Sequence, residues 1–261
     1  MAQLSIGTAW EETLAFVKRE GTLLFPVALM FLALPAVILQ LLTPGDMRAT
    51  KAVEGVKDAP QLPPEFLLAM LIVILIAMLG TLAINALALR PGISVAEALH
   101  LAVRRLPVLI GAALLLILGF AGLLLILSVI GGGLAAAMGM GAAMSLVALL
   151  AAPVLLFVAI RLLLLNAVVI DEPVNAPQAI RHGWRLTMGQ FWKLLGFIGV
   201  LIILMVVVQL VSQSIFGIAG RLIGGTTLSV LLAGLAVAVV NAVIQVYYLV
   251  MTCRIYRQLA G

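Results

Sequence analysis

Apolar residues along this chain gather in six long runs, separated by short segments that carry most of the charges. The runs cover roughly residues 22–42, 66–89, 108–130, 142–170, 191–216 and 228–251. A helix needs about 20 largely apolar residues to cross a bilayer, and each run reaches that length. None of the runs alternates with a period of two, as strands of a membrane barrel would. The pattern therefore predicts an all-α, polytopic membrane protein with six transmembrane helices.

Composition supports a bilayer as the solvent. Hydrophobic residues make up 65% and charged residues 10% of the 261 positions, against about 45–50% and about 25% in soluble domains. The net charge of +5 could indicate nucleic-acid binding, but the bases lie mostly in short segments between apolar runs, so we expect no nucleic-acid partner. Cys253 is the single cysteine, and His100 and His182 lie far apart. We therefore expect no metal site and no cofactor.

The distribution of basic residues predicts the orientation. Six spans place both termini on one side, and that side receives ten bases against four on the other. The ten are Lys18, Arg19, Arg90, Arg104, Arg105, Arg181, Arg185, Lys193, Arg254 and Arg257. Because cytoplasmic loops of membrane proteins are rich in Lys and Arg, we expect a bacterial inner-membrane protein with cytoplasmic termini. Residues 43–65 are the one sizeable soluble segment, an outer loop too short to bury a core.

The chain also carries a threefold sequence pattern. Thr8, Ser94 and Asn175 are each followed three residues later by Glu or Gln, which is the spacing of a helix capping box. Ten residues after each of these positions stands a base, at Lys18, Arg104 and Arg185. We interpret the chain as one membrane domain of three repeats, at about 8–93, 94–174 and 175–261. Each repeat begins with an amphipathic helix in the headgroup layer and continues with two spans.

The segment from Asp171 to Gly196 resembles a known bacterial family. The resemblance rests on Glu172, on Ala-Ile-Arg-His-Gly-Trp-Arg-Leu-Thr at 179–187 and on Gly-Gln-Phe-Trp-Lys-Leu-Leu-Gly at 189–196. The family is named for the membrane segment fused to some glycerophosphoryl diester phosphodiesterases. Pro173 and Gly183 depart from its usual glycine and serine, whereas the tail Tyr256-Arg257 fits. In that family the phosphodiesterase chemistry belongs to a separate barrel domain, which has no counterpart in this sequence, so the resemblance implies no enzymatic activity.

Arg161 is the strongest candidate for a functional residue inside a span. A charged side chain at the bilayer centre costs at least about 2.5–3.5 kcal/mol, so something must compensate it. Either it binds a lipid phosphate or a carboxylate, or its long side chain reaches the cytoplasmic headgroups. Four further polar residues complete a candidate intramembrane site or form ordinary interhelical hydrogen bonds. They are Asn85, Asn166, Asn241 and Gln245.

A second set of residues is suited to contact headgroups, or simply to anchor the chain at the interface. The set comprises Lys18, Arg104, Arg105, Arg181, Arg185, Trp184 and Lys193. We assemble no catalytic constellation from the sequence. The sequence favours a non-enzymatic protein that binds membrane lipid headgroups, or a partner protein, at its cytoplasmic interface. The alternative is a transporter or flippase of a lipid-like amphiphile that uses Arg161 and the intramembrane amides.

Overall fold

The computed structural model of the protein describes residues 5–43 and 63–260, and the regular secondary structure of this part of the chain is entirely helical. Six of its segments are long and apolar enough to cross a membrane. They are Ile6–Leu42, Pro64–Leu89, Val95–Gly133, Gly141–Asp171, Phe191–Phe216 and Gly234–Ala260. The predicted all-α membrane fold with six spanning helices is confirmed. The outer loop predicted for 43–65 falls mostly on residues 44–62, which lie outside the described residues.

The first span is built from three helical pieces joined without a loop: α1 (Ile6–Ala28), the π-helical turn η1 (Leu29–Ala33) and α2 (Leu34–Leu42). The turn lies between Pro26 and Pro35. Because a proline has no N–H and its ring crowds the preceding turn, a regular ladder cannot run through both positions. The wider turn lets the chain continue, since the N–H of the residue after it reaches five residues back.

Helix starts follow the predicted capping pattern in two of three places. Ser94 caps α5 (Val95–Met138), accepting the Glu97 N–H at 3.2 Å while its own N–H donates to the Glu97 carboxylate at 2.7 Å. At the first start the prediction is wrong, because Ser5 rather than Thr8 is the cap residue of α1 and its Oγ accepts the Thr8 N–H. Asn175 precedes α8 (Ala176–Leu186) as predicted.

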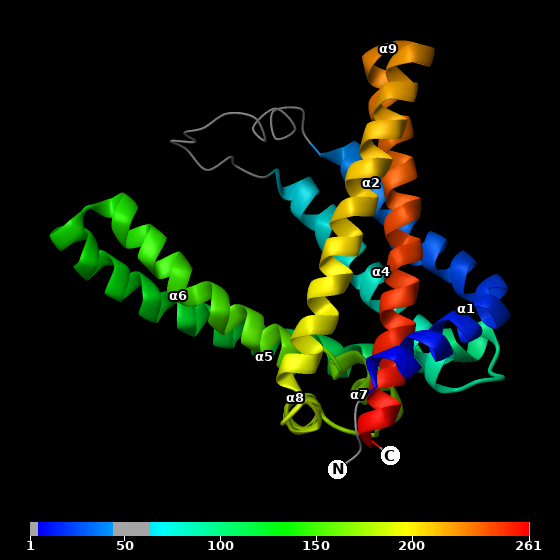
Figure 1. The fold of residues 1–261 in the computed structure, drawn as a ribbon, viewed down its shortest axis with the longest axis horizontal. Coiled ribbons are helices and arrows are strands. Elements are labelled where there is room, and N and C mark those ends of the chain that lie inside the picture. The colour runs from blue at the N-terminus through cyan, green and yellow to red at the C-terminus, as the bar shows by residue number, and fades with distance from the viewer. Residues whose placement is uncertain (1–4, 44–62, 261) are drawn as a thin grey trace.

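The span predicted for 142–170 is not one helix. Helix α6 (Met140–Arg161) follows α5 after Gly139, whose φ of +86° suits glycine. It ends at Arg161, and a short turn separates it from α7 (Leu165–Asp171). Figure 1 shows that α5 and α6 form a hairpin that projects away from the other helices, whereas α7 lies back among them. The predicted span is present, but it consists of two consecutive helices, α6 and α7, and not of the one unbroken helix expected from hydropathy.

Helix α9 (Phe191–Ala260) supplies the last two spans. Figure 1 shows it leaving α8, reversing at its far end and returning beside itself. We call its span Phe191–Phe216 the first arm and its span Gly234–Ala260 the second arm. Four residues separate α8 from its start. Helix α4 (Pro64–Leu89) packs against α5, α7 and α9.

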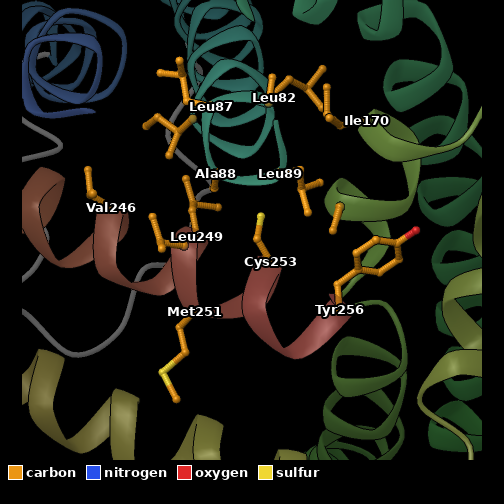
Figure 2. Packing of buried hydrophobic residues seen from close by; sticks show 14 of the residues in the cluster. Leu82, Leu87, Ala88, Leu89, Ile170, Val246, Leu249, Met251, Cys253 and Tyr256 are labelled. Atoms are coloured by element: carbon orange, nitrogen blue, oxygen red, sulfur yellow. The ribbon is translucent and has the colours of Figure 1, made fainter. Parts of the chain in front are cut away.

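The buried core lies at the end of the bundle that holds both chain ends. There the Ser5 N–H donates to Gln258 Oε1 at 3.1 Å, and we call this end the terminal face. Figure 2 shows the end of α4, with Leu82 and Leu89, meeting Ile170 and the second arm of α9. Many of the described apolar side chains farther out on the α5–α6 hairpin are exposed, as Val129 is at 76%. Such apolar exposure suits contact with lipid.

The three-repeat interpretation stays a prediction. Its amphipathic segments differ in form, because those of α1 and α5 continue directly into a span, whereas α8 is a separate helix. The shifted cap at Ser5 also makes the spacing between the three starts less regular than the sequence pattern indicates.

Candidate functional site

A hollow lined by several polar side chains lies along α8, at the terminal face. Its volume is about 670 Å³. Its lining residues are Val174, Gln178, Ile180, Arg181, His182, Trp184 and Arg185. We call it the α8 hollow. Within α8, Gln178, Arg181 and Arg185 follow one another at steps of three or four, which places them on one side of the helix.

Local sequence explains why α8 presents this side outward. Ala179 and Gly183 are buried, and a Cβ on Gly183 would lie 3.9 Å from the Leu165 Cα, so the small side of α8 packs on the start of α7. Arg181 and Arg185 are exposed on the other side. The lining carries two guanidinium groups and no carboxylate. A guanidinium offers paired donors to a phosphate or carboxylate, so the α8 hollow is suited to an anion.

Behind the α8 hollow, a chain of polar contacts joins three helices. The Tyr256 hydroxyl donates to Asp171 at 2.8 Å and also lies 3.3 Å from Glu172. The second carboxylate oxygen of Glu172 is 3.1 Å from His182 Nδ1. Tyr256 is only 2% exposed, so its hydroxyl needs these partners. Among the described residues, no cluster of His, Cys, Asp and Glu is suited to hold a metal ion, and these contacts bind α9 to α7 and α8.

The two residues after Tyr256 form further hydrogen bonds between helices at the terminal face. The Arg257 guanidinium donates to the carbonyl of Leu89, at the end of α4. Carbonyls in the last turn of a helix lack helical partners, and a cation there is favourable. Gln258 accepts from Ser5, at the start of α1. Three consecutive residues therefore connect α9 with α7, α4 and α1.

Arg161 lies beside α8 rather than at the centre of an unbroken span. Its guanidinium carbon is 5.0 Å from the Phe157 ring centre and 5.5 Å from that of Trp184. Thr187, just after α8, donates to the Arg161 carbonyl at 3.4 Å. Nε and Nη1 of Arg161 are buried without a hydrogen-bond partner. Cation–π contact with two rings offsets part of the cost of burying this charge.

The predicted intramembrane amides are spread over the fold. Asn85 is buried in α4 and accepts from the Cys253 thiol at 3.2 Å. Gln245 lines a small hollow of about 110 Å³ between the two arms of α9, together with Tyr248. Asn166 in α7 and Asn241 in α9 are half-buried. Arg161 lines neither this hollow nor the α8 hollow. The structure thus gives the members of the candidate intramembrane site different surroundings.

Of the candidate headgroup residues, the structure brings Arg181, Trp184 and Arg185 together in the α8 hollow. The remaining bases stand on other helices. Lys18 lies on α1, Arg104 and Arg105 on α5, and Lys193 at the start of α9, and all except the half-buried Arg105 are exposed.

Sequence reasoning missed the roles of Tyr256, Glu172 and His182. Two of their contacts join residues more than 80 positions apart in the chain, and no local pattern encodes such a pairing. The one available signal was the resemblance, which already included Glu172, His182 and Tyr256 among its matching positions.

Comparison of the chain with protein-family models, with curated proteins and with solved structures finds no match. The resemblance of residues 171–196 to the phosphodiesterase membrane segment therefore stays a prediction, and the geometry of the α8 hollow is the main guide to function.

Proposed function

We propose that this integral membrane protein binds the headgroups of anionic lipids in the α8 hollow and has no enzymatic activity of its own. The observation that carries the proposal is the pairing of Arg181 and Arg185 beside Trp184 in one hollow of about 670 Å³. Two guanidinium groups attract a phosphate, and a tryptophan is the residue typical of the bilayer interface. The proposal places the protein in a bacterial inner membrane with the terminal face in the cytoplasm.

Orientation is the first testable part of the proposal. Single cysteines introduced at Arg104 and at Arg185 are expected to react with an impermeant thiol reagent from the same side, the cytoplasmic one. Native Cys253 is fully buried, so the unsubstituted chain is the control and should stay unlabelled. Labelling of the two positions from opposite sides of the membrane would contradict both the proposed orientation and the predicted repeats.

Headgroup binding is the second testable part. The double substitution Arg181→Ala with Arg185→Ala is expected to weaken binding of phosphatidylglycerol by about 30-fold. Each base near a membrane surface contributes about 1 kcal/mol toward an anionic lipid, and about 1.4 kcal/mol is a tenfold change in affinity. The measurement is lipid binding to the purified protein by native mass spectrometry, with phosphatidylcholine as the zwitterionic comparison.

The matched control for this pair is Arg90→Ala. Arg90 is an exposed base just after α4 and does not line the α8 hollow. We expect this variant to keep nearly the whole preference for phosphatidylglycerol. Equal binding of both lipids by the unsubstituted protein would sink the proposal, and hydrolysis of a glycerophosphodiester by the purified chain would overturn its non-enzymatic part.

The transporter alternative receives less support from the geometry. It requires Arg161 and the amides to border one path, whereas Asn85 pairs with Cys253 and Gln245 lies between the arms of α9. A partner protein with an acidic surface would satisfy the same two arginines. The lipid proposal is preferred because Trp184, a residue type enriched at bilayer interfaces, lines the α8 hollow beside the two arginines.

A further inference from the structure

A second hollow, of about 440 Å³, lies between the first turns of α1 and the first arm of α9. We infer that it holds one acyl chain of an anionic phospholipid, and we call it the acyl groove. The inference deepens the proposed function, on which it rests for the identity of the headgroup. Gly7 and Trp10 line it on α1, Gly196, Phe197 and Val200 line it on the first arm of α9, and Met251 lines it on the second arm.

The chemistry of the lining selects an apolar occupant. The surface that lines the groove is almost entirely apolar. Every lining residue belongs to a segment that is long and apolar enough to cross the membrane. Water needs two to four polar partners in a buried site, which this lining does not offer. Phe197 and Met251 form the floor at 4% and 2% exposure, whereas Val200 is 67% exposed at the rim. A lipid chain is the apolar molecule that surrounds such a rim in a bilayer.

Two glycines give the groove its depth. A Cβ on Gly7 or on Gly196 would meet no atom within 4 Å, so neither glycine is needed for close packing of helices. Neither has a positive φ. A glycine inside a helix costs up to about 1 kcal/mol relative to alanine. What the missing side chains provide at these positions is open space, and both spaces belong to the same groove.

A base at the start of α9 lies in register with the groove and is suited to an anionic headgroup. Lys193 precedes Gly196 and Phe197 by three and four residues, so it shares their side of α9 and stands at the end nearest α8. From Gly196 the lining continues along the same arm to Leu204, about 12 Å of helix at 1.5 Å per residue. Along the chain the arginines of the α8 hollow come first, then Lys193, then the part of the acyl groove that the first arm of α9 forms. This is the order of charge and hydrocarbon in a phospholipid.

The test compares long-chain and short-chain lipids on the full-length protein in a non-ionic detergent. Wild type is expected to bind dioleoyl phosphatidylglycerol at least about tenfold more tightly than dihexanoyl phosphatidylglycerol, because only the longer chain fills the groove. The double variant Gly7→Leu with Gly196→Leu is expected to bind the long-chain lipid about tenfold more weakly than wild type. Its affinity for the short-chain lipid is expected to stay unchanged. The matched control is Gly199→Leu, since Gly199 lies on the same arm, has equally open surroundings and does not line the groove.

The outcomes separate this inference from the proposed function. Equal affinity for long and short chains, or an unchanged long-chain affinity in the filled variant, overturns the acyl groove while the headgroup preference still stands. The same chain-length comparison with phosphatidylcholine keeps the groove testable if the headgroup preference fails.

A second measurement does not depend on the folding of the filled variant. The Trp10 fluorescence, taken as the difference between wild type and Trp10→Phe, is expected to be quenched to a plateau at low mole fractions of a chain-brominated phosphatidylglycerol. Quenching that only rises in proportion to the mole fraction would indicate ordinary boundary lipid and would overturn the inference.

Discussion

Replacing Tyr256 by alanine is expected to lower the free energy of unfolding by about 3–5 kcal/mol, the usual cost of removing a large buried aromatic side chain. Tyr256 is 2% exposed in the core at the terminal face (Figure 2). Its loss leaves a cavity and also deprives Asp171 and Glu172 of a shared donor. Unfolding of the purified protein in detergent, or steric trapping in bilayers, gives the measurement.

Tyr256→Phe separates the two parts of that effect. It keeps the ring and removes the hydroxyl, so we expect a loss of about 1.5–3 kcal/mol, as for a hydrogen bond to a charged group. The control is Tyr247→Phe on the same arm, where the centres of the Tyr247 and Trp10 rings lie 6.5 Å apart. We expect this control to change the free energy of unfolding by no more than about 0.5 kcal/mol. If Tyr256→Phe is as stable as wild type, the Tyr256–carboxylate contacts contribute nothing and only ring packing counts.

The fold was predictable wherever a local signal sets it. Each span depends on the length of an apolar run, and the caps at Ser94 and Asn175 depend on residues three positions apart. The break after Arg161 gave no such signal, because Leu162–Leu164 are good helix formers without glycine or proline. The break is explained by tertiary packing instead, since α7 contacts α4, α5 and α8. An unbroken continuation of α6 would not bring α7 to these helices.

The candidate site was predictable to a similar extent. Arg181, Trp184 and Arg185 stand close together in one short helix, so their shared surface follows from helical spacing. The amide site required residues of different helices to meet at one depth, and hydropathy carries no information about which helices are neighbours. Arg161 illustrates the difference, because the sequence places it inside one span of residues 142–170, whereas α6 ends at this residue.

Replacing Gly80 by alanine is expected to lower the free energy of unfolding by about 1–3 kcal/mol, the cost of overpacking a well-filled core. Gly80 is buried in α4 against η1, and a Cβ placed on it would lie 2.4 Å from the Phe31 Cβ. That atom is fixed to the backbone of η1, so the clash cannot be relieved by rotating a side chain. Either α4 or η1 must move, and the contacts between α2, α4 and α9 move with them.

The sign of this effect is what makes it informative. Alanine is the better helix former, so substitution of a helical glycine without crowding should stabilise the protein by up to about 1 kcal/mol. Gly122→Ala in α5 is that control, because a Cβ there meets no atom within 4 Å. Opposite signs for the two substitutions, measured by unfolding in the same detergent, would establish that α4 and η1 pack closely at Gly80, with no room for a side chain there. A stabilising Gly80→Ala would instead mean that the first two spans are farther apart than the structure places them, and the core at the terminal face would have to be assembled differently.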